Sequence, residues 1–117
     1  MSALARTFEA SGLSTVVVSM MPVWGERDGA PRTLGVEFPF GHPCGMAGDV
    51  AMQTRVVRAA LDALAAEGPP PVIADFDEPW PGDFDEWKRA WHPKEPSPII
   101  RWMREQAAAR AREERGT

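Results

Sequence analysis

The N-terminal part of the chain shows two successive patterns. The first has apolar residues at helical spacing, and the second is a run that is apolar almost throughout. Residues 2–11 predict a short helix that ends before Gly12, because one face carries Leu4, Ala5 and Phe8. Residues 14–21 are almost continuously β-branched or apolar and are closed by Pro22. Such a run is typical of a strand buried on both faces, so we expect it in the middle of a parallel sheet.

The next segments carry weaker signals. Residues 24–31 combine two glycines with Asp and Pro, which predicts a turn-rich loop. Residues 33–39 predict a second strand, which pairs with the first either as a hairpin or as a neighbour in a larger sheet. Residues 72–74 are apolar and predict either a short third strand or merely extended chain.

Residues 50–67 have the clearest amphipathic pattern in the chain and predict a long helix. Asp49 is a good N-cap for it, and Gly68 followed by three prolines ends it. We expect its apolar stripe at Val50, Val57, Leu61 and Leu64, widened by Val56 and Ala60.

The composition changes after Pro69. Between Asp75 and Glu86 lie six acidic residues and no basic residue, interleaved with aromatic side chains. Ser97 and Pro98 are a favourable cap and first position for a last helix with an apolar start. After Gln106 this helix has no apolar stripe, so we expect its end to fray into solvent.

Together these elements predict an α/β fold. It is a small three-layer α/β domain with a short, mostly parallel sheet that forms a Rossmann-like or flavodoxin-like half, plus a Trp-rich C-terminal helical extension. We therefore divide the 117 residues into an α/β region, residues 1–68, and an acidic, Trp-rich extension with the last helix, residues 69–117.

Charge and composition narrow the functional classes. A formal net charge of −4 argues against nucleic acid as the main partner, since phosphate binding needs a basic face. No apolar run approaches the roughly 18 residues of a membrane span. The N-terminus is no signal peptide, so we expect a cytoplasmic protein. A single cysteine, Cys44, excludes an internal disulfide framework and a Cys-rich zinc site.

Several short motifs follow one another in a distinctive order: Glu9-Ala10-Ser11-Gly12-Leu13-Ser14-Thr15-Val16, Pro31-Arg32, Phe38-Pro39-Phe40-Gly41-His42-Pro43, and a helix opening at Gly48-Asp49. In order and spacing this set resembles the C-terminal part of the component B selenoproteins of the glycine, sarcosine, betaine and D-proline reductases. The resemblance covers residues 3–66, and the Trp-rich segment after Pro69 lies outside it.

The resemblance implies a reductive cleavage reaction. Family members carry a selenocysteine, or a cysteine in some relatives, in a thiol loop just before the first matched helix. The selenolate attacks the substrate carbon, displaces the amine, and is resolved reductively by other components. Here only Met1 and Ser2 precede that helix, so the reactive residue has no counterpart. We expect one half of a split protein, or a trimmed relative with another use.

Cys44 is the only soft nucleophile of the chain and lies a few residues before a helix N-terminus, which favours the thiolate. His42 could assist it. The alternative is that Cys44 is a small packing residue, and it does not match the reactive position of the family.

The loop from Gly41 to Gly48, with His42 and Gly45 inside it, leads into a capped helix and could bind an anion such as a substrate carboxylate. Arg32 is the candidate partner for that carboxylate, because its planar guanidinium can donate to both carboxylate oxygens. The alternative is a connection that is merely rich in glycine.

The histidines, His42 and His92, are far apart and have no carboxylate or second histidine at a ligand spacing, so we expect no metal and no cofactor. The acids between Asp75 and Glu86 lack the spacing of a calcium loop and predict a solvated face. The dense tryptophans either complete the core or bind a partner subunit, with Trp80, Trp87 and Trp91 as the candidate interface.

Three functions remain open from the sequence. The first is a subunit of a reductase complex, not catalytic alone, whose partner chain supplies the N-terminal half with its thiol or selenol loop, or which pairs as a homodimer. The second is a non-catalytic binding or assembly module on the same fold. The third is a free-standing thiol protein that uses Cys44.

Overall fold

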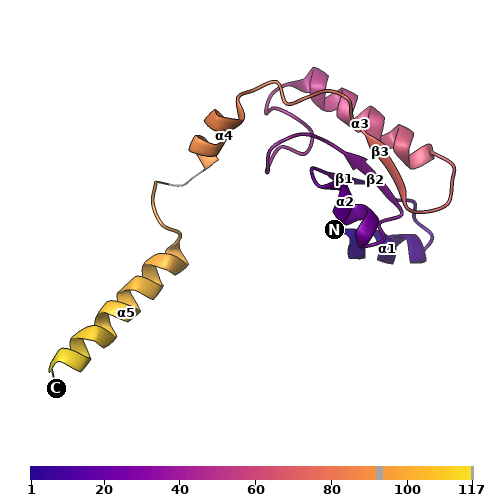
Figure 1. The fold of residues 1–117 in the computed structure, drawn as a ribbon. Helices are drawn as coiled ribbons and strands as arrows, with labels where there is room; N and C mark the ends of the chain where they lie inside the picture. The colour runs from indigo at the N-terminus through magenta and orange to yellow at the C-terminus, as the bar shows by residue number, and fades with distance from the viewer. Residues whose placement is uncertain (92–93, 117) are drawn as a thin grey trace. The chain divides into compact units, whose positions relative to one another are not determined.

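The structure is a computed structural model that describes residues 1–91 and 94–116. The chain divides into two compact units, Met1–Phe84 and Asp85–Thr117. The first unit contains the elements α1 (Ser2–Ala10), β1 (Val17–Ser19), α2 (Pro22–Arg27), β2 (Arg32–Gly35), α3 (Val50–Ala65) and β3 (Val72–Asp75) (Figure 1).

The three strands form one parallel sheet in the order β1-β2-β3. One row of the sheet runs through Val17, Thr33 and Ile73, and Gly35 pairs with Asp75 at its carboxyl end. The predicted small α/β domain with a short parallel sheet is therefore confirmed. The hairpin alternative for the first two strands is wrong, because these strands run parallel.

Helices cover both faces of this sheet. Leu34 is fully buried against α3, in a cluster that also contains Val36, Phe38, Met52 and Val56. Thr33 and Gly35 face the other way, where Gly25 and Pro22 of α2 come close to them. Alternate residues of β2 therefore face α3 and α2 in turn. Figure 1 shows these two helices on opposite sides of the sheet.

Two expectations about the first unit are wrong. Residues 24–31 were expected to form a loop, but α2 occupies the first half of that segment, residues 24–27. Pro22 at its first turn has a backbone angle suited to helix, and Gly25 lets the helix approach Thr33 closely. The first strand was expected in the middle of the sheet, but within the described residues β1 pairs only with β2 and stands at an edge.

The long helix has the expected cap and a different buried face. The carboxylate of Asp49 accepts a hydrogen bond of 2.9 Å from the backbone N–H of Met52. The buried residues of α3 are Met52, Val56, Ala60 and Ala63. The expected stripe is confirmed at Val56 and Ala60, which are buried, and wrong at Val50, Val57 and Leu61, which are exposed.

The boundary between the units also differs from the division at Gly68 and Pro69. The segment after the prolines pairs with β2 as strand β3, and the aromatic residues that follow it pack on the core of the first unit. The first compact unit therefore extends to Phe84.

The second unit is helical. It contains most of α4 (Phe84–Trp91) and all of α5 (Pro98–Gly116), and neither helix has a buried residue. The start of α5 follows Ser97, as expected, and the backbone N–H of Arg101 donates to its carbonyl. The expected fraying after Gln106 is wrong, because α5 is continuous to Gly116.

Candidate functional site

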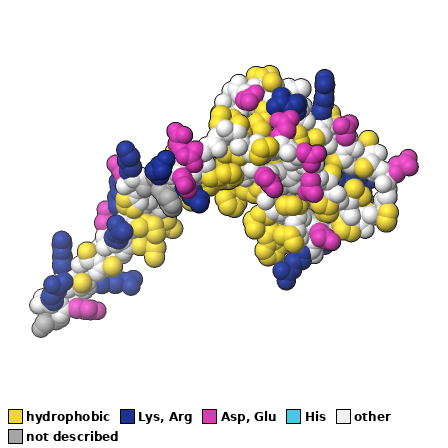
Figure 2. All heavy atoms as spheres, turned by 45° about the horizontal axis from the view of Figure 1, so that its top comes forward, with side chains coloured by type: hydrophobic (Ala, Val, Ile, Leu, Met, Phe, Trp, Pro, Cys, Tyr) yellow, Lys and Arg dark blue, Asp and Glu magenta, His cyan; other side chains and the backbone are white. Residues whose placement is uncertain are grey.

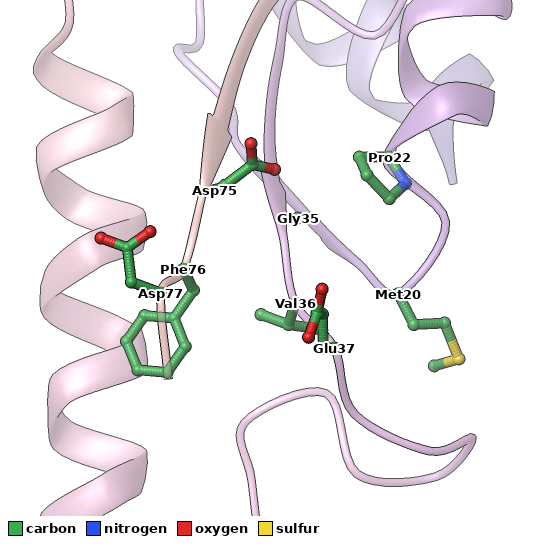
Figure 3. Close-up of a pocket in the computed structure, with 8 residues that line it drawn as sticks. All are labelled: Met20, Pro22, Gly35, Val36, Glu37, Asp75, Phe76 and Asp77. Atoms are coloured by element: carbon green, nitrogen blue, oxygen red, sulfur yellow. The ribbon is translucent and has the colours of Figure 1, made fainter. Parts of the chain in front are cut away.

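A cavity of about 460 Å³ opens at the carboxyl ends of the three parallel strands (Figure 3). Each strand contributes to it: Met20 follows β1, Gly35 ends β2 and Asp75 ends β3. The full lining comprises Met20, Pro22, Gly35, Val36, Glu37, Asp75, Phe76 and Asp77. In open parallel sheets this edge is where ligands bind, and the volume suits a small molecule.

Gly35 permits the closest approach in this cavity. A Cβ atom on Gly35 would lie 2.9 Å from Oδ1 of Asp75 and 2.9 Å from Cγ of Pro22. Figure 3 shows the carboxylate of Asp75 pointing from the end of β3 toward Gly35, while the carboxylate of Asp77 points away from it. Only glycine leaves room for a carboxylate directly over β2.

The charge of the cavity is negative. Glu37, Asp75 and Asp77 contribute three exposed carboxylates, and among the described residues no Lys, Arg or His belongs to the lining. Figure 2 shows acidic side chains spread over the face of the first unit that is turned toward the viewer, with few basic ones between them. This lining favours a cationic ligand, such as a small ammonium group.

The reactive groups of the cavity are its three carboxylates. Its lining, taken from the described part of the chain, contains no thiol, hydroxyl, amine or imidazole. Within the same described residues, no group of three or more His, Cys, Asp or Glu side chains is placed to hold a metal ion. The cavity can therefore bind and orient a ligand, and its carboxylates can exchange a proton with it. His92 lies outside the described residues.

Cys44 and His42 lie in the loop that follows β2 and do not line this cavity. Cys44 is half-buried and packs against the hydrophobic core. The ring of His42 lies 5.1 Å from the ring of Trp80, which in turn lies 5.9 Å from the ring of Phe38. Both residues thus take part in the packing above the carboxyl end of the sheet.

Arg32 begins β2 at the opposite end of the strand. Its Nη1 donates to Oε1 of Glu9 at 2.8 Å, and the same oxygen accepts from the backbone N–H of Thr15 at 2.6 Å. The Thr15 N–H is the main cause of the lowered pKa of Glu9, and the Arg32 charge adds to it. The structure therefore does not bring Arg32 together with the loop from Gly41 to Gly48.

The glycine loop itself packs on α3. Gly41, Gly45 and Gly48 all have positive φ angles, and a Cβ on Gly45 would lie 2.7 Å from Sδ of Met52. The N-terminus of α3, where an anion was expected, already receives the carboxylate of Asp49. This carboxylate occupies the position and supplies the charge that a bound anion would bring.

The tryptophans of the candidate interface fall into two sets. Trp80 belongs to the first unit and packs on its core. Trp87 and Trp91 stack on each other in α4, with ring centres 5.8 Å apart. The three residues therefore do not form one cluster within a single unit.

Sequence reasoning missed the carboxylates of the cavity. It assigned Asp75 and Asp77 to a solvated face and gave Glu37 no role. A usable signal was present, since Asp75 ends the third strand, and Glu37 and Asp77 lie two residues beyond the ends of the second and third strands. The carboxyl ends of parallel strands meet at one edge, so the parallel pairing is the information that brings the acids together.

In comparisons with known proteins, no family model, no curated protein and no solved structure matches this chain. None of the helices in the described part of the chain is long and apolar enough to cross a membrane. The assignment of function therefore depends on the geometry of the cavity and on the sequence motifs.

Proposed function

We propose that this chain is a subunit of a cytoplasmic reductase complex similar to the component B selenoproteins, and that it binds a small substrate carrying an amine. A partner chain with the thiol or selenol loop supplies the reactive selenocysteine or cysteine. The observation that carries the proposal is a carboxylate-lined cavity at the carboxyl edge of the sheet, whose lining among the described residues contains no thiol.

The charge of the lining matches the substrate class that the resemblance implies. Glycine, sarcosine, betaine and proline share an ammonium group, which Glu37, Asp75 and Asp77 can attract. Carboxylates beside an ammonium group also favour its charged form. The amine of glycine, sarcosine or proline would thus be held protonated, the form in which its nitrogen leaves most readily, while the quaternary nitrogen of betaine is permanently charged.

The chemical step then divides between the two chains. The selenolate or thiolate of the partner attacks the substrate carbon that carries the nitrogen. A carbon–selenium or carbon–sulfur bond forms as the carbon–nitrogen bond breaks, and the amine leaves with the bonding electron pair. A thiol or selenol of another component, acting as the reductant, then resolves the adduct. This chain contributes binding and orientation.

The fold supports the same proposal. Three parallel strands with helices on both faces are what one half of a Rossmann-like or flavodoxin-like sheet contains, and we propose this relationship for the first unit. We also propose that α4 and α5 together form the Trp-rich extension.

The test is ligand binding to the isolated chain, followed by NMR amide shifts. Betaine and methylammonium are expected to shift the amides of Gly35 and Phe76, whereas acetate is not. Asp75→Asn should weaken this binding by about tenfold, since it removes one of the charges that face the ligand. Asp62→Asn, at an exposed position of α3, is the matched control and should bind as the wild type does. Equal shifts with acetate, or an unchanged affinity in Asp75→Asn, would overturn the assignment.

A second candidate, the binding or assembly module, is favoured by the exposed apolar side chains of the second unit. Trp91, Ile99, Trp102 and Met103 are each more than half exposed. Aromatic residues are enriched at interface centres. Co-expression with the product of the adjacent gene tests this candidate. Trp102→Ala should abolish co-purification while Trp24→Ala, in α2, preserves it.

A further inference from the structure

The two edges of the sheet are protected to very different degrees. The strand β3, whose outer side forms one edge, is preceded by Pro69, Pro70 and Pro71, and its carboxyl end carries Asp75 and Asp77. Proline and charge both discourage pairing with a further strand. At the other edge, the chain from Ala10 to Gly25 carries no charged residue. β1 lies inside this uncharged stretch, and no proline precedes it there.

An apolar groove of about 310 Å³ runs along the unprotected edge. Its floor is Thr15, Val16, Val17 and Val18, and its wall is formed by Met1, Leu4, Ala5 and Phe8. Leu4 and Phe8 lie one turn apart on α1 and are 46% and 42% exposed. Within the described residues no strand pairs with β1 on this side. The groove therefore offers backbone hydrogen bonds and apolar contacts to an extended segment.

We infer that a second copy of this chain occupies the groove, through antiparallel pairing of the two β1 strands about a two-fold axis at Val17. The pairing joins two three-stranded sheets into one continuous sheet. Identical strands meeting at a two-fold axis form an isologous contact, in which each copy offers the same surface.

The sequence of β1 fits this pairing with itself. A centre at Val17 places Val16 opposite Val18 and Thr15 opposite Ser19 of the other copy. Valine pairs pack well across antiparallel strands. Each residue in this register is paired with one that points to the same face of the sheet, since both numbers are odd or both are even. The face that packs on α3 in one copy therefore continues into the same face of the other copy.

Charge permits a second copy to pair along this edge. The stretch from Ala10 to Gly25 carries no charged residue, and the Glu9 carboxylate that bonds Thr15 is paired with Arg32 at 2.8 Å. Two copies can therefore meet along β1 without bringing unpaired like charges together. This inference does not depend on the proposed function, since the cavity lies at the carboxyl ends of the strands and the groove lies along an edge.

The test compares two lysine substitutions in the same row of the sheet. Val17→Lys places two ammonium groups opposite each other at the axis, while Ile73→Lys places one on the other edge. Light scattering behind a sizing column should show the wild type and Ile73→Lys at twice the 12.9 kDa chain mass. Val17→Lys should raise the dimer dissociation constant by at least about tenfold, because like charges face each other.

A second measurement keeps the inference testable if Val17→Lys fails to fold, which circular dichroism would reveal. In a Cys44→Ala background, Val17→Cys should form a disulfide-linked dimer on mild oxidation, and Ile73→Cys should not. Antiparallel partners lie within the Cα distance that a disulfide spans. A wild-type monomer at all concentrations, a dimer equally sensitive to both lysines, or cross-linking through Ile73→Cys would overturn the inference. A monomer would assign the groove to a strand of another chain.

Discussion

Gly35 and Asp75 are directly paired at the carboxyl ends of β2 and β3, and Oδ1 of Asp75 lies over the position where any other residue at 35 would place its Cβ. The same position is crowded by Pro22 at the start of α2. A single small residue thus keeps three elements close together and leaves the cavity open at their junction. The chemistry of the candidate site therefore depends on a residue that carries no functional group.

Gly35→Ala is expected to close part of the cavity. The new Cβ would force Asp75 or Pro22 to move, since 2.9 Å is shorter than any relaxed contact with carbon. Betaine binding should fall by about tenfold or more, while circular dichroism shows a retained fold. Gly116→Ala, where a Cβ meets open space, is the control. Unchanged betaine affinity in Gly35→Ala would remove the cavity from consideration.

Val56→Ala and Val57→Ala test which face of α3 is buried. Val56 is 0% exposed and Val57 is 48% exposed, although the two residues are neighbours in the same helix. Val56→Ala should lower the free energy of unfolding by about 2 kcal/mol, from lost burial and the cavity that remains. Val57→Ala should change it by less than about 0.5 kcal/mol. Urea unfolding measures both, and a larger loss in Val57→Ala would favour the stripe expected from the sequence.

These two valines show how far the sequence could predict the fold. The existence of α3 and its cap at Asp49 were predictable, because they depend on neighbouring residues, while its end at Ala65 lies two residues before the expected end. The buried face was not, because α3 carries apolar residues on two adjacent faces and the sheet decides which one is covered. The true face is turned by one residue, from Val57 to Val56 and from Leu61 to Ala60.

The candidate site was less predictable for a related reason. Asp75 and Glu37 are far apart in the sequence and meet only because β2 and β3 pair in parallel and in register. α2 was missed because its close packing at Gly25 depends on Thr33, a residue of the next strand. Local patterns contain neither the pairing of strands nor the approach of one element to another.

Glu9→Gln tests the clamp between α1 and the amino ends of the first two strands. The pKa of Glu9 is lowered from its usual 4.5, chiefly by the backbone N–H of Thr15. A carboxylate with a lowered pKa stabilises the fold above its unfolded value, and this contribution is lost as the pH falls through the folded value. The variant should unfold at lower urea than the wild type at about pH 7.

The same difference should shrink as the pH falls below the unfolded value of Glu9 and through its lowered folded value, because Glu9 then becomes protonated in both states. Glu67→Gln, at an exposed position after α3, should behave as the wild type across this pH range. A difference between Glu9→Gln and the wild type that is independent of pH would show that charge is not the cause.

Cys44→Ala separates the reductase subunit from the free-standing thiol protein. Cys44 packs on the core and does not line the cavity, so a reconstituted complex should keep its turnover within about tenfold. Loss of a nucleophile usually costs orders of magnitude more. Single-turnover assays with the folded variant decide the matter, and a complete loss of activity would make the thiol protein the better assignment.

The last prediction is that residues 1–84 fold on their own. All of the buried apolar residues that the structure describes lie in this part of the chain, from Ala5 to Ala63, as do the three strands and the ion pair between Arg55 and Glu78. The helices α4 and α5 bury none of their residues. A domain keeps its stability when its core and backbone pairing are intact, so the shortened chain should unfold within about 2 °C of the full chain. Val56→Ala in the shortened chain shows that the assay is sensitive, since it should lower the midpoint by several times that amount. A shortened chain that aggregates or unfolds at much lower temperature would show that the second unit stabilises the first.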